Sequence, residues 1–195
     1  MQDFIKNRII ESIQTKSKLL ENQLFVQNIE KAVKVCTETF QKNGVVLFCG
    51  NGGSAADAQH LAAEFSGRFY FDREPLNSEA LHVNTSYLTA VGNDYSFDEV
   101  YARLVRAKGH KGDVLFAIST SGNSPNILKA IEAAKKLDMT VVGLTGETGG
   151  KMAGICDILL NVPSKDTPRI QECHILTGHI ICELVESSLF SKPVE

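Results

Sequence analysis

Residues 44–67 read GVVLFCGNGGSAADAQHLAAEFSG, and this stretch decides the fold. A continuous apolar run is followed by a glycine-rich turn and then by an alanine-rich segment. The apolar run predicts a buried strand at 44–50, and the alanine-rich segment predicts a helix at 54–67. A buried strand that leads through a short loop into a helix is typical of a parallel sheet covered by helices.

The same alternation continues to the end of the chain. Apolar patterns predict further strands at 80–83, 113–119, 140–146 and 157–162, and further helices at 96–108, 124–138 and 169–190. Ser96 and Glu99 have the spacing of a capping box at the start of one of these helices. We therefore expect an α/β fold with a doubly wound, mainly parallel, flavodoxin-like sheet flanked by helices.

The chain before the first strand is long and helical in pattern. Within residues 3–42, apolar side chains recur at spacings of three and four, which predicts two amphipathic helices. We expect a single domain over 1–195, made of N-terminal helices at 1–43 and an α/β core at 44–195. A minimal α/β unit does not need such an extension, so we expect these helices to pack against another subunit.

Composition narrows the function classes. The 195 residues are 43% hydrophobic and 22% charged, with a net charge of −3, as expected of one globular domain. Without a basic surplus, nucleic acid is not an expected partner. No signal peptide or membrane-spanning apolar run is evident, so no membrane association is expected. Five cysteines without a C-x-x-C pair are typical of reduced thiols in a cytoplasmic protein.

Hydroxyl side chains gather directly after the strand at 113–119. The segment STSGNS contains Ser119, Thr120, Ser121 and Ser124, and the next helix follows at once. Hydroxyls and backbone N–H groups at a helix N-terminus suit a phosphate dianion. The alternative is an ordinary polar loop in which Ser124 caps the helix. The G-x-x-x-x-G-K-[ST] pattern is absent, which argues against a P-loop nucleotide triphosphatase.

The glycine-rich loop of the first unit supports two interpretations. GNGGS at 50–54 does not fit the G-x-G-x-x-G dinucleotide fingerprint, because Ala55 stands where a glycine is required. Its glycines indicate either a tight turn with positive φ or a backbone that approaches a small polar ligand.

Histidine and glutamate recur one helical turn apart. His60 and Glu64 share a helix face, and His179 and Glu183 repeat the spacing on the last predicted helix, with Gln171 and His174 nearby. Such groups can bind a divalent transition metal. The spacing alone is also that of a surface salt bridge.

Taken together, CGNGGSAADAQHLAAEFSGRF, TAVGND, ISTSGNSPNILKAI and QECHILTGHIICELVE resemble the phosphoheptose isomerases of the sugar-isomerase (SIS) superfamily. The resemblance runs through nearly the whole chain. It implies a cytoplasmic homotetramer that can bind zinc. It also implies an enzyme that interconverts sedoheptulose 7-phosphate and glycero-manno-heptose 7-phosphate, the step that opens bacterial ADP-heptose synthesis for the lipopolysaccharide core.

The resemblance also implies residue roles. The sugar would be lined by Asn51, Gly52 and Gly53 and contacted by Asn93 and Asp94, and the phosphate would be held by Ser54, Ser119, Thr120, Ser121 and Ser124. The metal would be coordinated by His60, Glu64, Gln171 and His179, with Gln171 and Glu64 also contacting substrate. By the same resemblance, His174 and Glu183 would have no role.

Isomerisation through an enediol needs a base and an acid, and we assign these roles to Glu64 and His179. Gln171 and His179 are eight residues apart, which is roughly 12 Å along a straight helix. Either the helix begins irregularly, or two subunits share the site, and we favour the shared site. Two alternatives remain: a non-catalytic SIS protein such as the DnaA initiator-associating protein, and an isomerase of another phosphosugar such as arabinose 5-phosphate or a hexulose phosphate.

Overall fold

The computed structural model describes residues 1–190, so 191–195, the last part of the predicted domain, lies outside the described residues. The strands are β1 (Val46–Gly50), β2 (Ser78–Ala80), β3 (Val114–Ile118), β4 (Thr140–Thr145) and β5 (Ile158–Asn161). They form one sheet in the order β2-β1-β3-β4-β5, and every pairing is parallel. This order confirms the doubly wound prediction and places the topological switch point between β1 and β3.

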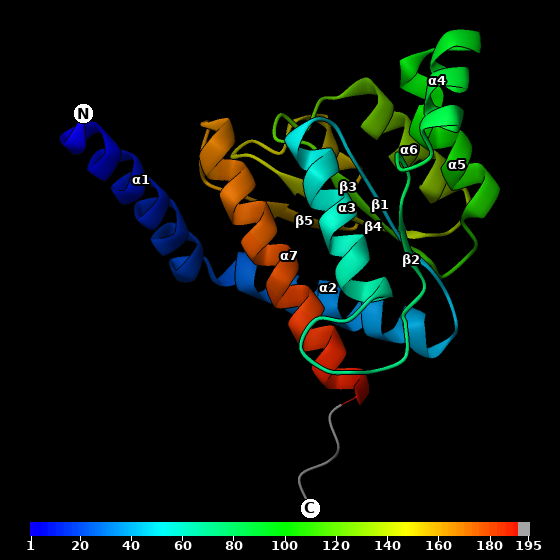
Figure 1. The fold of residues 1–195 in the computed structure, drawn as a ribbon, viewed down its shortest axis with the longest axis horizontal. Coiled ribbons are helices and arrows are strands. Elements are labelled where there is room, and N and C mark those ends of the chain that lie inside the picture. Colours follow the sequence, from blue (N-terminus) through cyan, green and yellow to red (C-terminus); the bar gives the residue numbers. More distant parts are fainter. Residues whose placement is uncertain (191–195) are drawn as a thin grey trace, which may run out of the picture.

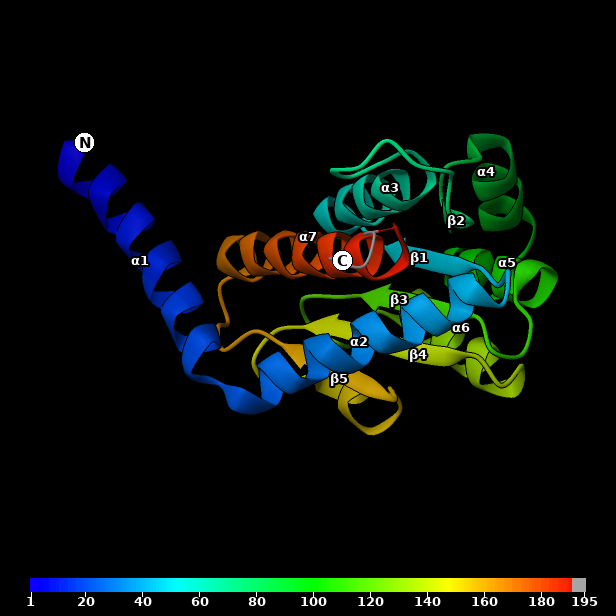
Figure 2. The same ribbon diagram turned by 90° about the horizontal axis from the view of Figure 1, so that it is seen from below.

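Helices cover both faces of the sheet (Figures 1 and 2). One face carries α2 (Gln23–Gln41), α3 (Gly53–Ser66) and α7 (Thr167–Phe190), and the other carries α4 (Thr85–Asp94), α5 (Val100–Lys108) and α6 (Pro125–Lys136). Strand side chains alternate between the faces. Phe48 and Phe116 therefore stack on the first face with ring centroids 4.8 Å apart, while Leu47 and Leu115 lie in the core of the second.

The predicted N-terminal helices are present, but they behave differently. Asn22 separates them and caps α2 by accepting a hydrogen bond from the N–H of Phe25 at 3.1 Å. Helix α2 packs on the sheet, whereas α1 (Gln2–Glu21) contacts α7 and α2 and extends away from the rest of the domain (Figure 2). Large apolar side chains are exposed along α1, namely Phe4, Ile5, Ile9, Ile10 and Ile13.

The region around α4 differs from the expectation. The strand predicted at 80–83 is instead Ser78–Ala80, and the segment after it forms a helix that begins after the N-cap residue Asn84. The capping box is also absent. Ser96 makes no side-chain cap bond, and a short 3₁₀ helix, η1 (Phe97–Glu99), precedes α5. The carboxylate of Glu99 accepts a hydrogen bond from Lys129 at 3.0 Å instead.

Two expectations from composition can be compared with the structure. All five cysteines are free thiols, and four of them are buried. Across residues 1–190, no helix combines the length and the apolar character needed to cross a bilayer.

Candidate active site

The candidate site lies between α3 and α7, which lie side by side on the sheet and run in the same direction (Figure 1). Near their N-termini, the amide of Gln171 packs on Gly53, where an added Cβ atom would fall 2.5 Å from Nε2. Two turns further on, Gly178 packs on Leu61 in the same way. These two glycines allow the helices to approach closely along their shared face.

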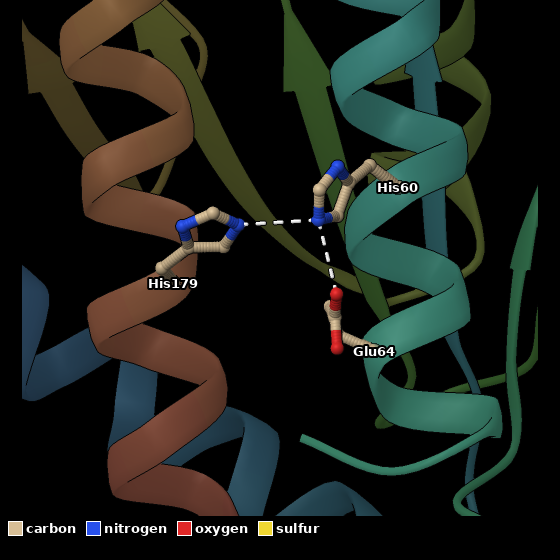
Figure 3. Close-up of side chains that lie close together, drawn as sticks. All are labelled: His60, Glu64 and His179. Carbon is tan, nitrogen blue, oxygen red and sulfur yellow. Dashed lines mark hydrogen bonds and ion pairs between the residues drawn. The ribbon is translucent and has the colours of Figure 1, made fainter. Parts of the chain in front are cut away.

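Three predicted site residues meet where α3 and α7 face each other. The Nε2 atom of His60 lies 3.0 Å from Oε1 of Glu64 and 3.2 Å from Nε2 of His179 (Figure 3). The possible ligand atoms of the three side chains all lie within 4.8 Å of one another. Glu183 is exposed and lies outside this cluster. The H-x-x-x-E pair on α3 therefore contributes both of its residues to the cluster, whereas the pair on α7 contributes only His179.

Burial and charge set the protonation of the cluster. Burial lowers the pKa of His179, the nearby His60 lowers it further, and Glu64 opposes both. His179 is therefore neutral near pH 7, and a neutral imidazole nitrogen has the lone pair that a metal needs.

An acid that the sequence analysis did not single out lies beside this cluster. Burial raises the pKa of Asp57 to about 6, and the charge of His60 opposes this shift. Within residues 1–190, the buried Oδ2 atom of Asp57 has no hydrogen-bond partner. Asp57 precedes His60 by three positions and Glu64 by seven, so one stripe of α3 carries all three. The spacing of three and seven residues was the signal in the sequence from which Asp57 could have been predicted.

The donor set fits a zinc ion. Two imidazole nitrogens and a carboxylate oxygen are typical zinc ligands, with bonds of about 2.0–2.2 Å. Tetrahedral bonds of that length separate ligand atoms by about 3.3–3.6 Å. The 3.0 Å from His60 to Glu64 and the 3.2 Å from His60 to His179 are close to this separation, and all three ligand atoms lie within 4.8 Å of one another.

Gln171, the fourth ligand that the resemblance implies, lies elsewhere. Helix α7 is continuous from Thr167 to Phe190, so an irregular start does not bring Gln171 to His179. The Gln171 amide instead lies against Gly53 at the beginning of α3. This chain therefore brings together three of the four expected ligands.

The serine-rich loop forms a compact hydroxyl cluster at the end of β3. The Oγ atom of Ser119 lies 3.0 Å from Oγ of Ser124 and 3.4 Å from Oγ of Ser121. Ser124 is the N-cap residue of α6 but makes no side-chain cap bond, so its hydroxyl belongs to the cluster. Thr120 lies beside it and accepts a backbone hydrogen bond from Gly146 at 2.9 Å. Hydroxyls at a positive helix end are suited to an anion.

The glycine-rich loop is tied to the serine-rich loop. Asn51 and Asn126 exchange reciprocal side-chain hydrogen bonds of 2.9 and 2.8 Å, and Asn126 is buried. Gly52 and Gly53 are exposed, with a φ of 56° at Gly52, while Ser54 is buried at the start of α3. The Asn51 side chain thus joins the two loops, and the exposed backbone is that of the two glycines. Asn126 was not predicted, because its position after Pro125 does not reveal its burial.

Asn93 and Asp94 lie apart from these groups. They end α4, both are exposed, and Nδ2 of Asn93 donates to Oδ1 of Asp94 at 3.0 Å. Apart from this bond, and in the part of the chain that the structure describes, neither side chain is hydrogen-bonded to a predicted site residue. Both side chains therefore remain available on an exposed helix end.

Two hollows are lined in part by predicted site residues. An open hollow of about 410 Å³ is lined by Ala56, Gln59, His60, Ala63 and Glu64. A smaller cavity of about 230 Å³ lies at the carboxyl ends of β3 and β4, and its walls include Thr120, Ser121, Glu147, Thr167 and Ile170. The larger hollow opens to the surface on the side of the histidines.

Comparison with known proteins identifies the family. Residues 10–146 match the SIS domain family. The phosphoheptose isomerase of Aneurinibacillus thermoaerophilus is 52% identical over 190 residues, covering 97% of this chain and 96% of the relative. That of Clostridium acetobutylicum is 48% identical over the full length of both chains, 100% of each.

Solved structures agree. The phosphoheptose isomerase of Neisseria gonorrhoeae superposes with a TM-score of 0.90 and 46% identity, covering 95% of this chain and 98% of that one. The enzyme of Francisella tularensis gives a TM-score of 0.91 and 39% identity over the same shares. This chain therefore belongs to the SIS-domain family and, within it, to the phosphoheptose isomerases.

Proposed function

We propose that this protein is an aldose–ketose isomerase that converts sedoheptulose 7-phosphate to D-glycero-D-manno-heptose 7-phosphate, the first step of bacterial ADP-heptose and lipopolysaccharide core synthesis. The observation that carries the proposal is the meeting of Glu64 and His179 where α3 and α7 face each other. The loop that precedes α3 is joined to the serine-rich loop by the hydrogen bonds between Asn51 and Asn126. The relatives that match nearly the whole chain are named phosphoheptose isomerases, which supports the substrate.

The reaction moves a proton between adjacent carbons through an enediol. Glu64 is the base that removes the C–H proton and returns it to the neighbouring carbon. Its Oε1 atom contacts His60, and within residues 1–190 no hydrogen bond engages Oε2. His179 is neutral near pH 7, so it moves a proton between the substrate oxygens as an imidazole rather than as an imidazolium.

The polar loops hold the two ends of the substrate. Ser54, Ser119, Thr120, Ser121 and Ser124 bind the phosphate, and the backbone of Gly52 and Gly53 approaches the sugar. From Ser54 to His60 the axis of α3 rises by about 9 Å, a span suited to an extended phosphosugar. Asn51, Asn93, Asp94 and Gln171 complete the predicted contacts to the sugar.

We assign the metal site to zinc, held by His60, Glu64 and His179, with Gln171 as a further ligand. A bound zinc ion would polarise the substrate carbonyl. Zinc ligation lowers the basicity of a carboxylate, so the ligand role and the base role of Glu64 are in tension when both are at full strength. Metal content should fall on chelation and return on addition of zinc, and activity measured in parallel shows whether the ion is needed for turnover.

We also propose that the protein is a cytoplasmic homotetramer with active sites shared between subunits. The exposed apolar side chains of α1 support an interface. The open hollow over His60 and Glu64 leaves room for residues of a neighbouring chain, and Gln171 lies away from the histidines of its own chain.

Turnover of sedoheptulose 7-phosphate, coupled to a heptose kinase, tests the reaction. Glu64→Gln should abolish turnover while leaving folding and phosphate binding nearly unchanged. Glu183→Gln, the same change at an exposed position on α7, is the matched control. Retained activity in Glu64→Gln overturns the assignment of the base. Turnover of arabinose 5-phosphate or a hexulose phosphate alone would assign a different substrate, and capture of DnaA without turnover would indicate a binding protein.

Coexpression of Glu64→Gln and Gln171→Ala chains tests the shared site. If Gln171 acts in the site of a neighbouring chain, some sites in a mixed oligomer contain no substitution, and activity returns. If both residues act within one chain, every site carries a substitution and the mixture stays inactive. The pair Glu64→Gln and His179→Gln should show no recovery, because these two residues meet within one chain.

A further inference from the structure

A buried ion pair lies beyond the cluster of His60, Glu64 and His179, toward the C-terminal ends of α3 and α7. Nε of Arg73 donates to Oε1 of Glu186 at 2.9 Å, and the two side chains are only 2% and 1% exposed. Arg73 lies in the segment between α3 and β2, and Glu186 lies on α7 two turns after His179. The pair therefore joins the segment that follows α3 to the helix that carries His179.

The carboxylate of Glu186 organises the loop in front of it. It accepts hydrogen bonds from three consecutive backbone N–H groups, those of Phe69 at 2.9 Å, Tyr70 at 2.6 Å and Phe71 at 3.0 Å. This fixes the loop directly after α3 on the surface of α7. It also places the ring of Phe69 with its centroid 5.7 Å from that of His179.

The guanidinium of Arg73 completes the end of α3. The last carbonyl groups of a helix lack partners within the helix. Nη2 of Arg73 donates to the carbonyl of Glu64 at 2.9 Å, and Nη1 donates to those of Phe65 at 2.8 Å and Gly67 at 3.1 Å. The backbone of the proposed base is thus hydrogen-bonded directly to the ion pair.

Stability alone does not account for such a pair. The cost of removing two charges from water commonly equals or exceeds their attraction, and apolar residues of similar volume often serve a fold equally well. What an apolar replacement could not supply is a fixed fork of donors to the carbonyls of α3 and an acceptor for three loop N–H groups.

We propose that Arg73 and Glu186 are positioning residues that hold Glu64 of α3 and His179 of α7 in register with each other; this role rests on the proposed isomerase function. Neither side chain touches substrate. The pair fixes the backbone of Glu64 from one side and the Phe69 face of His179 from the other. Since the serine cluster lies at the opposite end of α3, phosphate binding does not depend on the pair.

Kinetics of Glu186→Gln and Arg73→Lys test this role. Glu186→Gln removes the charge that compensates Arg73, and Arg73→Lys keeps the charge but loses the fork. We expect kcat to fall about tenfold to a hundredfold, as for a small misplacement of a catalytic group, while KM for the phosphosugar stays within about twofold. Glu186→Asp, which keeps the charge, should recover part of kcat and serves where Glu186→Gln does not fold.

A nuclear magnetic resonance measurement tests the geometry without turnover. The ring of Phe69 shifts the ring proton resonances of His179, so these resonances at fixed pH report whether the two rings keep their arrangement. We expect them to move in both variants. Glu99→Gln, which changes a half-buried ion pair with Lys129 elsewhere on the domain, is the matched control and should change neither kcat nor these resonances.

The outcomes separate the alternatives. A lower melting temperature with unchanged kcat and unchanged His179 resonances would show that the pair only stabilises the fold, and would overturn the proposal. If the wild-type protein does not turn over sedoheptulose 7-phosphate, the proposed function fails. The His179 resonances of the variants then still decide whether the pair positions this histidine.

Discussion

Gly178 of α7 lies directly against Leu61 of α3, and a Cβ atom added to Gly178 would fall 2.5 Å from both Cδ atoms of that leucine. Leu61 is itself buried in the core, so it has no solvent-filled space to retreat into. The missing side chain at 178 therefore sets the separation of the two helices. That separation brings Nε2 of His60 to 3.2 Å from Nε2 of the adjacent His179.

Gly178→Ala should move α3 and α7 apart, and it should therefore lower activity more than it lowers the stability of the fold. Overpacking a core typically costs about 1–3 kcal/mol, and the better helix propensity of alanine returns up to about 1 kcal/mol. We expect a modest loss in the free energy of unfolding by urea titration, together with a loss of kcat at 25 °C that exceeds the loss of folded protein.

Gly92→Ala on α4 is the control for stability, because an added Cβ atom there meets nothing within 4 Å. This variant should be neutral or more stable. If Gly178→Ala keeps full activity, the close approach of α3 and α7 is not needed for the site.

Ser119→Ala should weaken phosphate binding. The Ser119 hydroxyl is buried and bridges those of Ser121 and Ser124, so its loss removes one phosphate donor and loosens the other two. Each such hydrogen bond to a charged group contributes about 1.5–3 kcal/mol. KM should therefore rise by about tenfold or more, with kcat changed less. Inorganic phosphate should also inhibit the variant less strongly than the wild type. An unchanged KM would contradict the role of the serine cluster in phosphate binding.

Local patterns predicted the parts of the fold that local forces determine. The β1–α3 unit, β3 and α7 each have a continuous apolar or helical pattern, and all three were predicted close to their observed bounds. Helix α4 was missed because Gly92 and several small polar residues hide its period, although Asn84 caps it. The capping box failed because Lys129, distant in sequence, binds Glu99.

The side-chain pairs that hold the site in place could not be predicted, because each pair joins segments that are distant in the sequence. Asn51 and Asn126 form their amide pair across the switch point. Arg73, in the segment after α3, forms its ion pair with Glu186 of α7. The position of Gln171 is an intermediate case. Helical spacing alone indicated that Gln171 and His179 would hardly reach one metal ion from a single regular helix, and α7 is one continuous helix.

Asp57→Asn should make the protein more stable near neutral pH. Burial raises the pKa of Asp57 from 3.8 to about 6, so the folded state favours the protonated carboxyl. The contribution of Asp57 to the free energy of unfolding is fully present below about pH 4. It declines as the pH rises toward 6 and then stays at its lowest value. Urea midpoints from pH 4 to 7.5 should therefore favour the variant increasingly as the pH rises. A variant that is equally stable throughout would contradict this sign.

The stability of the wild type should also depend on His174, with the opposite sign. His174 is fully buried on α7, and its Nε2–H donates to the carbonyl of Thr145 at 3.1 Å. Burial lowers its pKa to about 4. Above pH 6.5 the imidazole is neutral in both states. Between pH 6.5 and 4 only the unfolded chain takes up the proton. The free energy of unfolding therefore decreases by about 3 kcal/mol in total as the pH is lowered through this range.

His174→Gln separates this effect from that of Asp57, which acts in the opposite direction over nearly the same pH range. Glutamine can still donate to the carbonyl of Thr145 but does not titrate. The variant should be less stable than the wild type at pH 7.5, because the imidazole fills its site. The difference between them should then shrink as the pH falls toward 4. Parallel stability curves for the two proteins would show that His174 is not the buried group that titrates.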